Sequence, residues 1–206
     1  MISILVDGPI CSGKTTVVQG LAREGFLPIV EPVTKAHKDF FYENPKKNGL
    51  VFDVLLASQR TMDWITQHAR AAEKVGLRGV VGDRWAPSAR VFINAYMEDG
   101  PDKQLLEDVI ARLEEDLSPP THIVLLTCPI EELQRRLLPR SLCESADSEK
   151  NGVTGEYLAK LEKGYAEYGT WLGERFPDAK LVHLNSENFV SPAQVLDSLG
   201  LNRGEN

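Results

Sequence analysis

Short apolar segments alternate along the chain with longer segments in which apolar residues recur every three or four positions. The short segments are rich in β-branched residues and hold few polar positions, as strands buried on both faces do. They predict strands at residues 2–6, 26–30, 79–82, 122–127 and 181–184. The periodic segments predict helices at residues 14–24, 51–75, 87–96, 102–117, 130–138, 155–173 and 191–199. This alternation predicts an α/β fold, in which helices cover both faces of a parallel sheet and ligands bind at the carboxyl ends of the strands.

Two segments carry weaker strand and core signals. Residues 35–49 are polar and aromatic. Residues 140–154 are rich in Ser, Glu, Asp and Gly, and they follow a predicted helix that ends in arginines. No repeat and no long Pro/Gly/Ser linker divides the chain, so its 206 residues predict a single domain.

The composition indicates which partners and which cell compartment to expect. The formal net charge of -7 argues against a protein held to nucleic acid mainly by phosphate neutralisation. The three cysteines are widely spaced and form no C-x-x-C pair, so neither a disulfide framework nor a zinc site is expected. No segment has the pattern of a signal peptide or of a membrane span. We therefore expect a cytoplasmic protein with no membrane partner.

Residues 8–15 read GPICSGKT, the phosphate-loop pattern G-x-x-x-x-G-K-T, between a predicted strand and a predicted helix. Backbone N–H groups in such a loop surround an anion together with the positive end of the helix. Lys14 is expected to reach the β- and γ-phosphates, and the Thr15 hydroxyl is expected to bind Mg²⁺. ATP and Mg²⁺ are therefore the predicted cofactors. The predicted donor-site residues are Gly8, Cys11, Ser12, Gly13, Lys14, Thr15 and Thr16.

Charged residues follow the second and third predicted strands. Pro32 restricts Glu31 to an extended backbone, and a carboxylate there could accept the proton of an attacking hydroxyl, unless it is a solvated loop residue. Asp83 could hold Mg²⁺, and Arg84 could neutralise the transferring phosphoryl group. An ordinary Asp–Arg surface pair is the alternative. The position of both residues at the end of a buried strand favours the site.

The polar segment after the predicted helix 130–138 indicates a lid, over about residues 139–154, that closes on the nucleotide. A plain surface loop is the alternative. Arg136 and Arg140 lie four residues apart, so they share a helix face and could bind ATP phosphates. Arg140 is favoured because it lies at the loop itself, whereas Arg135 is expected to face solvent.

Beyond the phosphate loop, an ordered set of motifs runs through most of the chain. It comprises Glu31-Pro32-Val33, Tyr42-Glu43-Asn44-Pro45, Asp83-Arg84-Trp85, Cys128-Pro129 and residues 156–161. The set resembles the deoxynucleoside kinase family, which belongs to the same fold group as thymidylate kinases. The resemblance implies the P-loop NTP hydrolase fold, with five parallel strands in the order 2-3-1-4-5.

The resemblance also implies roles for individual residues. Glu31 matches the family's general base for the sugar 5′-hydroxyl. Tyr42 matches the residue that binds the 3′-hydroxyl and excludes a ribose 2′-hydroxyl, and Arg60 matches a base-contacting arginine. Arg140 matches a lid arginine, and Glu144 falls near the lid acid that reaches the sugar 3′-hydroxyl.

Several positions depart from the family pattern, among them Leu142, which stands where a second lid arginine is expected. Asp83 stands where the family usually has Glu. Asp53 replaces a base-reading Gln, and it could accept two donors of guanine or form a salt bridge with Arg60, seven residues along the same predicted helix. Ala89 stands where cytidine- and purine-preferring members often have Asp, which resembles thymidine-preferring or broad-specificity members. The indications from Asp53 and Ala89 conflict, so the sequence does not decide which base the acceptor nucleoside carries.

The nearest alternative is a monophosphate kinase resembling thymidylate kinases. Those enzymes usually carry an arginine just before Glu-Pro, where this chain has Val30. An unpaired Glu31 would repel a dianionic phosphate but suit a neutral hydroxyl, so a nucleoside acceptor is favoured. A hydroxymethyl-modified pyrimidine, even within DNA, also stays open. A nucleotide-dependent switch is disfavoured because the chain contains no N-K-x-D motif.

We therefore predict a deoxynucleoside kinase of nucleotide salvage that transfers the γ-phosphoryl group of ATP to the 5′-hydroxyl of a deoxynucleoside. The predicted catalytic residues are Lys14, Glu31, Arg84 and Arg140. The predicted substrate-binding residues are Glu31, Tyr42, Asp53, Arg60, Arg84, Ala89 and Glu144, and the predicted metal ligands are Thr15 and Asp83. The resemblance further implies a homodimer that pairs through the predicted helices 51–75 and 102–117.

Overall fold

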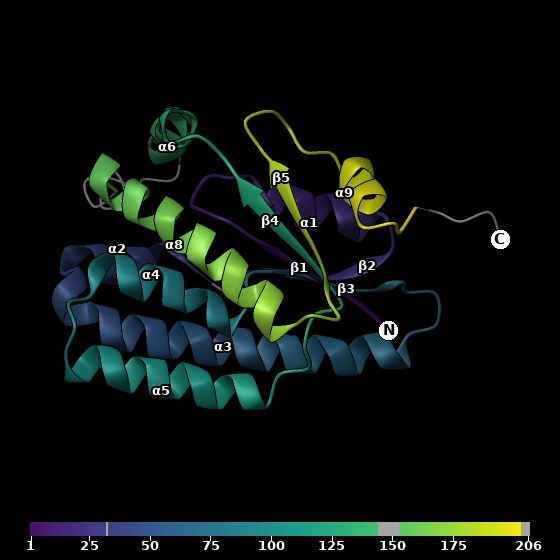
Figure 1. Ribbon diagram of the computed structural model, residues 1–206, viewed down its shortest axis with the longest axis horizontal. Coiled ribbons are helices and arrows are strands. Elements are labelled where there is room, and N and C mark those ends of the chain that lie inside the picture. The colour runs from purple at the N-terminus through teal and green to yellow at the C-terminus, as the bar shows by residue number, and fades with distance from the viewer. Residues whose placement is uncertain (32, 144–152, 203–206) are drawn as a thin grey trace.

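Five parallel strands form the central sheet in the order β2-β3-β1-β4-β5 (Figure 1). The computed structural model describes residues 1–31, 33–143 and 153–202, apart from the side chains of residue 46 and residues 138–143. The strands are β1 (Ile2–Asp7), β2 (Phe26–Ile29), β3 (Gly79–Asp83), β4 (His122–Thr127) and β5 (Lys180–Asn185). The predicted strands, their parallel pairing and their order are confirmed.

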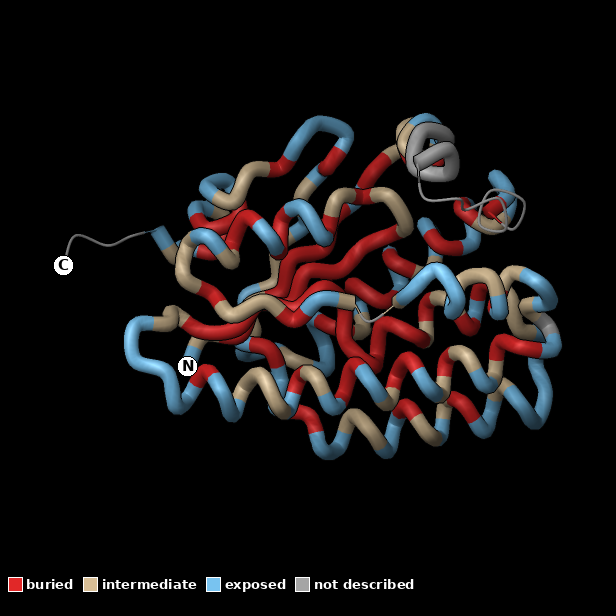
Figure 2. The backbone as a smooth tube through the Cα atoms, turned by 180° about the vertical axis from the view of Figure 1, so that it is seen from behind, coloured by how far each residue is buried: buried red, intermediate tan, exposed pale blue. Residues whose placement is uncertain are grey.

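Helices cover both faces of the sheet (Figure 1). One face carries α1 (Lys14–Arg23) and α9 (Pro192–Ser198), and the other carries α3 (Pro45–Glu73), α4 (Ala89–Tyr96), α5 (Pro101–Glu115) and α8 (Gly155–Arg175). Along β1, Ile4 and Val6 pack into the hydrophobic core beneath α1 and α9, whereas Leu5 packs into the core on the other face. Figure 2 shows the buried strands enclosed between these layers. Burial on both faces explains why the strands are continuous apolar runs in the sequence.

The strand register determines where the functional loops begin. Val6 of β1 lies opposite Asp83 of β3, and Ile29 of β2 lies opposite Gly82. The carboxyl ends of three adjacent strands therefore meet at one edge of the sheet. The phosphate loop, Glu31 and Arg84 all leave from that edge.

The polar and aromatic segment 35–49 is helical, which its weak sequence signal did not indicate. Thr34 caps α2 (Lys35–Glu43): its hydroxyl accepts from the His37 N–H at 3.3 Å, and the His37 ring accepts from the Thr34 N–H. The Asn44 side chain caps α3 by accepting from the Lys47 N–H at 3.2 Å, so α3 begins six residues before its predicted start. Helix α2 buries only Phe41, which leaves no apolar periodicity to detect.

Two further helix boundaries differ from the prediction. Helix α6 (Ile130–Cys143) continues past Pro139, where the prediction ended it at residue 138. The predicted helix 87–96 divides into a short 3₁₀ turn, η1 (Ala86–Ser88), and α4. The predicted lid falls mainly outside the described residues, because residues 144–152 are not described.

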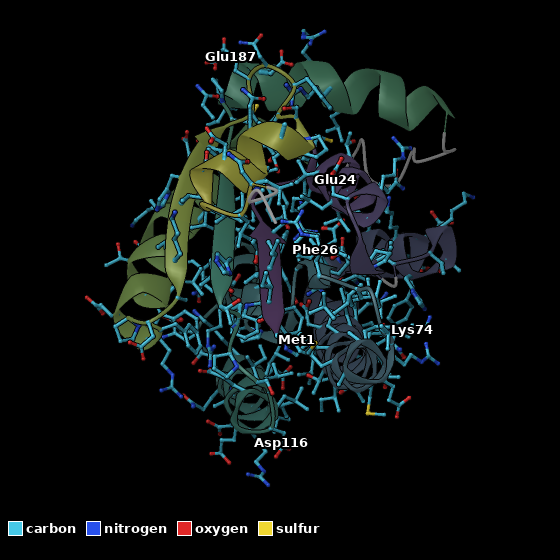
Figure 3. All side chains as sticks on the ribbon, turned by 90° about the vertical axis from the view of Figure 1, so that its right-hand side faces the viewer. Met1, Glu24, Phe26, Lys74, Asp116 and Glu187 are labelled. Atoms are coloured by element: carbon cyan, nitrogen blue, oxygen red, sulfur yellow. The ribbon has the colours of Figure 1, made fainter. Side chains whose placement is uncertain are left out.

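Helices α3 and α5 lie side by side on the outer surface of their layer. Figure 3 looks along both helices and shows their ends, near Lys74 and Asp116, next to each other. Among the residues that the structure describes, no helix is both long enough and apolar enough to cross a bilayer.

The packing of α1 against α9 leads to a first prediction. A Cβ added at Gly20 would overlap the ring of Pro192, whereas a Cβ at Gly173 of α8 would have its nearest neighbour, Leu181 Cδ2, at 3.8 Å. We expect Gly20→Ala to lower the free energy of unfolding by about 1–2 kcal/mol, because overpacking outweighs the gain in helix propensity. Gly173→Ala, the matched control, should raise it by up to about 1 kcal/mol. Urea unfolding measures both, and equal stabilisation of the two variants would contradict the close packing of α1 on α9.

Candidate active site

The phosphate loop adopts a backbone that leaves the first N–H groups of α1 available to a ligand. Gly8 has φ 148°, and a Cβ there would lie 2.5 Å from the Leu126 carbonyl oxygen. Gly13 has φ 89° and precedes α1 with no side-chain cap on that helix. The first N–H groups of α1 are therefore free to bind an anion. The Ser12 hydroxyl is also buried without a hydrogen-bond partner, as expected of a group that awaits a ligand.

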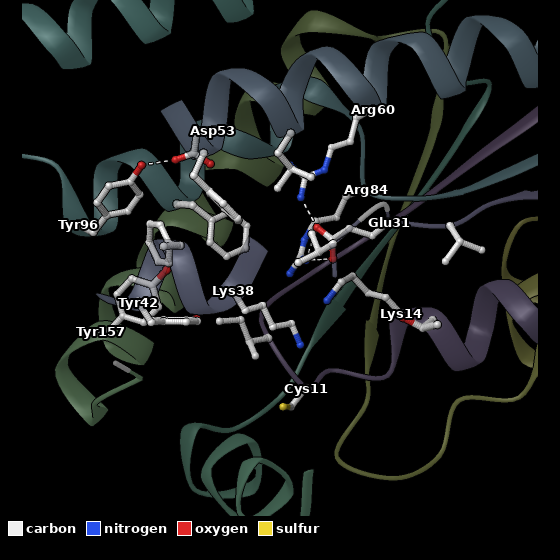
Figure 4. A pocket seen from close by; sticks show the side chains of 18 residues that line it. Cys11, Lys14, Glu31, Lys38, Tyr42, Asp53, Arg60, Arg84, Tyr96 and Tyr157 are labelled. Carbon is white, nitrogen blue, oxygen red and sulfur yellow. Dashed lines mark hydrogen bonds and ion pairs between the residues drawn. The ribbon is translucent and has the colours of Figure 1, made fainter. Parts of the chain in front are cut away.

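Two cavities meet at the phosphate loop. The donor-side cavity, about 560 Å³, is lined by the loop, by the start of α1, and by residues that follow β5: Ser186, Asn188, Phe189 and Val190. The acceptor-side cavity, about 300 Å³, lies between the sheet edge and α2, α3 and α4 (Figure 4). The residues shared by both cavities are Cys11, Lys14 and Thr15. Groups bound in the two cavities would therefore face each other across Lys14.

Glu31 stands in the acceptor-side cavity as part of a cluster of opposite charges. Its two carboxylate oxygens accept from Arg84 Nη1 at 3.0 and 2.8 Å, and Oε1 also accepts from Arg60 Nη2. Burial alone would raise the pKa of Glu31, but Arg84, Arg60 and Lys14 together hold that pKa below its ordinary value. Glu31 is therefore ionised and paired. The assumption of an unpaired Glu31, used above against a phosphorylated acceptor, is wrong, because two guanidinium groups compensate the carboxylate.

Arg84 is held from several sides at once. Its backbone has φ 66°, a left-handed conformation that is uncommon for a residue with a side chain. Its Nη2 donates to the Gly8 carbonyl at 3.2 Å, and its guanidinium lies 4.7 Å from the centre of the Phe92 ring. Only 7% of Arg84 is exposed. The arginine thus connects the phosphate loop to Glu31.

Asp7 and Tyr165 complete this cluster, and neither residue was predicted as part of the site. The Asp7 carboxylate is fully buried and accepts from the Gly8 N–H at 2.8 Å, from the Tyr165 hydroxyl at 3.0 Å and from the Ser88 hydroxyl. The Tyr165 hydroxyl in turn accepts from Arg84 Nε at 3.4 Å. A carboxylate that ends an otherwise apolar buried strand, directly before the loop, was the available sequence signal for Asp7.

Thr15 and Asp83 come together in a way that fits a magnesium ion. The Thr15 hydroxyl donates to Asp83 Oδ2 at 2.6 Å, while the buried Asp83 Oδ1 has no hydrogen-bond partner. Burial raises the pKa of Asp83, so a cation beside it would favour its ionised form. Within the described ranges, no three His, Cys, Asp or Glu side chains converge on a metal position. A hydroxyl, one carboxylate and phosphate oxygens are instead the ligands that phosphate-loop enzymes give to Mg²⁺.

Lys14 is buried at the junction of the two cavities. Its Nζ donates to the Pro9 carbonyl at 2.7 Å. Burial, with the nearby charge of Arg84, lowers the pKa of Lys14 to about 8. Phosphate groups would stabilise the charged ammonium form.

The predicted substrate residues divide into two groups in the structure. Tyr42, Asp53 and Arg60 line the acceptor-side cavity. Ala89 is 1% exposed in the hydrophobic core and does not line that cavity. Asp53 accepts from the Tyr96 hydroxyl rather than forming an ion pair with Arg60, whose charge partner is Glu31. Glu144 lies outside the described residues.

Arg136 joins the phosphate loop to the segment after β5. It donates to the backbone carbonyls of Cys11 at 3.3 Å, Ser186 at 2.6 Å and Glu187 at 2.8 Å. These bonds show how the arginine positions the two walls of the donor-side cavity, whereas its predicted contact with ATP phosphates stays a prediction. Arg135, as expected, faces solvent and pairs with Glu132. The side chain of Arg140 is outside the described part of the structure.

Comparison with known proteins gives a family match and a fold match. A model of the deoxynucleoside kinase family matches residues 4–198. A structure of deoxyadenosine kinase from M. mycoides with bound dCTP is 18% identical, with a TM-score of 0.77 over 97% of this chain and 99% of that one. A second structure of that enzyme, with bound dATP, is 17% identical, with a TM-score of 0.71 over 97% and 100% of the two chains. No curated protein sequence matches the chain.

The buried polar cluster leads to a second prediction. Tyr165→Phe removes a hydroxyl that bonds to two charged groups, so we expect the free energy of unfolding to fall by about 2–3 kcal/mol. Tyr168→Phe is a matched control on the same helix, because the buried Tyr168 hydroxyl bonds neutral side chains, accepting from Trp85 Nε1 at 2.6 Å and contacting Ser88. Its loss should cost about 1 kcal/mol. Denaturant unfolding of both variants is the measurement, and equal losses would contradict the importance of the charged partners.

Proposed function

Since the chain belongs to the deoxynucleoside kinase family, and is thus a phosphotransferase, we propose that it transfers the γ-phosphoryl group of ATP to the 5′-hydroxyl of a deoxynucleoside. One observation carries this proposal: the donor-side and acceptor-side cavities share Lys14, and Glu31 stands beside it on the acceptor side. A hydroxyl bound near Glu31 would face a phosphate bound in the loop. Phosphoryl transfer needs that alignment more than it needs covalent help from the protein.

On the acceptor side, Glu31 would orient the 5′-hydroxyl and receive its proton. Two arginines keep the carboxylate ionised and make it a weak base. A weak base suits a loose transition state, in which the hydroxyl loses its proton late. Tyr42, on the wall of the same cavity, would contact the sugar and exclude a ribose 2′-hydroxyl.

On the donor side, the charge that develops on the phosphoryl oxygens would be stabilised by Lys14 and Arg84. Both side chains are buried, so their charges act where water screens them little. Thr15 and Asp83 would hold Mg²⁺, which neutralises phosphate charge when bound. Arg140, from the predicted lid, would add a further cation.

The acceptor is proposed to be a nucleoside rather than a monophosphate because of the family and the position of Glu31. A 5′-phosphate would bring two further negative charges, which need cations that are not already paired with Glu31. The exposed Val30, which precedes Glu31, adds no cation for such a phosphate. Arg84 and Arg60 weaken the repulsion but are already engaged by Glu31.

The predicted homodimer would use α3 and α5. The outward side chains of these helices include exposed apolar residues: Val51, Leu55, Met62, Ile65 and Leu105. This surface is compatible with a second copy, and the dimer stays a prediction, as do the role in salvage and the cytoplasmic location.

The role of Glu31 leads to a third prediction. Glu31→Gln removes the proton acceptor, so kcat should fall by roughly 10²–10⁴-fold, whereas the affinity for ATP should change little. Steady-state kinetics and ATP titration separate the two effects. Glu73→Gln, at the exposed last position of α3, is the control and should retain wild-type kcat. A turnover of Glu31→Gln equal to that of the wild type would remove Glu31 from the mechanism.

The lowered pKa of Lys14 leads to a fourth prediction. Lys14 is charged below pH 8, and bound phosphates raise its pKa, so ATP binding above pH 8 must take up a proton. The Kd for ATP, measured by calorimetry, should therefore rise roughly tenfold between about pH 8 and pH 9.5. Lys14→Arg keeps its charge over this range and should show a flat profile. A flat profile in the wild type would contradict the assigned contact between Lys14 and phosphate.

A further inference from the structure

The guanidinium group of Arg84 is bonded to the protein through each of its three nitrogens. Its Nη1 binds the Glu31 carboxylate, with the shorter contact at 2.8 Å (Figure 4). Its Nη2 donates to the Gly8 carbonyl at 3.2 Å, and its Nε donates to the Tyr165 hydroxyl at 3.4 Å. One nitrogen therefore meets the proposed proton acceptor, and the other two hold the group from behind.

A second carboxylate lies behind Arg84, on the side away from Glu31. Asp7 is fully buried, and its Oδ1 lies 3.7 Å from Arg84 Nε. The Tyr165 hydroxyl connects the two, because it accepts from Arg84 Nε and donates to Asp7 Oδ1 at 3.0 Å. Burial, with the charge of Asp7 nearby, raises the pKa of Tyr165, so its hydroxyl keeps the proton that it donates. Arg84 thus stands between two carboxylates.

Asp7 and Tyr165 are themselves held firmly. Asp7 accepts from the Gly8 N–H at 2.8 Å and from the Ser88 hydroxyl, in addition to Tyr165. The Tyr165 ring meets Phe92 edge-on, with the ring centres 6.3 Å apart. Neither Asp7 nor Tyr165 lines the donor-side or the acceptor-side cavity. Any part that they take in catalysis must therefore act through a residue that they bond.

The proposed reaction changes the charge on only one side of Arg84. The 5′-hydroxyl oxygen forms a bond to the γ-phosphorus, and the bond from that phosphorus to the β–γ bridging oxygen breaks, leaving its electron pair on ADP. The hydroxyl proton passes to Glu31, whose carboxylate becomes neutral. The ion pair of Arg84 with Glu31 is lost in this step, while Asp7 takes no part in the transfer and keeps its charge.

We propose that Asp7 and Tyr165 are positioning residues, which hold Arg84 in place while Glu31 takes up the proton and Nη1 turns from the carboxylate to the phosphoryl oxygens. The inference rests on the proposed function. A guanidinium fixed at Nε and Nη2 needs little reorganisation to meet the charge that develops on the phosphoryl group. Without Asp7 and Tyr165, the arginine would lose its remaining charge partner as soon as Glu31 became neutral.

The test compares kcat, the KM for a deoxynucleoside and the Kd for ATP in the wild type and in Tyr165→Phe, at a temperature where circular dichroism shows both to be folded. We expect kcat to fall roughly tenfold, and KM and Kd to change less than about threefold, because Tyr165 touches neither ligand. Tyr168→Phe is the matched control, since its hydroxyl bonds Trp85 and not Arg84. It should retain wild-type kcat.

A double-mutant cycle shows whether Tyr165 acts through Arg84. Arg84→Lys keeps a positive charge but removes the Nε that the Tyr165 hydroxyl holds. In this background, Tyr165→Phe should lower kcat by less than about twofold, because the two changes remove the same contact. Independent, multiplying losses of kcat would overturn the inference, as would wild-type kcat in Tyr165→Phe alone.

Asp7→Asn keeps the test decisive if Tyr165→Phe does not fold. Its amide oxygen can still accept from the Gly8 N–H, but the charge that faces Arg84 is gone, so kcat should fall about tenfold or more. A weaker Kd for ATP with unchanged kcat would show that Asp7 acts through the phosphate loop, which would overturn the inference. Phosphorylation of deoxynucleoside monophosphates in place of nucleosides by the wild type would instead overturn the proposed function.

Discussion

The pairing of opposite charges, Glu31 with Arg84, is the interaction on which the site depends. Arg84 is buried and Glu31 is partly buried, so each charge would be destabilising without a partner of opposite sign. Arg84 extends the pairing to the Gly8 carbonyl of the phosphate loop and, through Tyr165, to Asp7. The guanidinium group of Arg84 therefore connects the ends of three adjacent strands with helix α8.

This arrangement gives the site a rigid centre between two cavities. The phosphate loop needs open N–H groups to receive an anion, and the acceptor side needs an ionised carboxylate that stays in place. The charged cluster satisfies both, because its members bond one another and leave the first N–H groups of α1 unused. The preorganised charge is worth more here than on the surface, since water does not reorganise around it.

The strands and most helices could be predicted from the sequence. Strands buried on two faces are continuous apolar runs, and helices buried on one face have apolar residues every three or four positions. Helix α2 and the first residues of α3 did not follow, because α2 buries a single residue and gives no period, and the caps of the two helices, Thr34 and Asn44, act through hydrogen bonds. The helix predicted at residues 130–138 is longer in the structure, because α6 continues past Pro139. Local residue preferences are weak where tertiary packing competes with them.

The sequence by itself determined the phosphate loop and the charged residues at strand ends, because each depends on neighbours along the chain, whereas the sheet order came from the resemblance to a known family. Only the tertiary structure decided the partners. In the structure, Arg60 forms an ion pair with Glu31, and Asp53 accepts a hydrogen bond from Tyr96. Ala89 lies in the hydrophobic core. Spacing along one helix shows which side chains share a face, but the partner that meets them comes from another element, at a distance in sequence that no local pattern encodes.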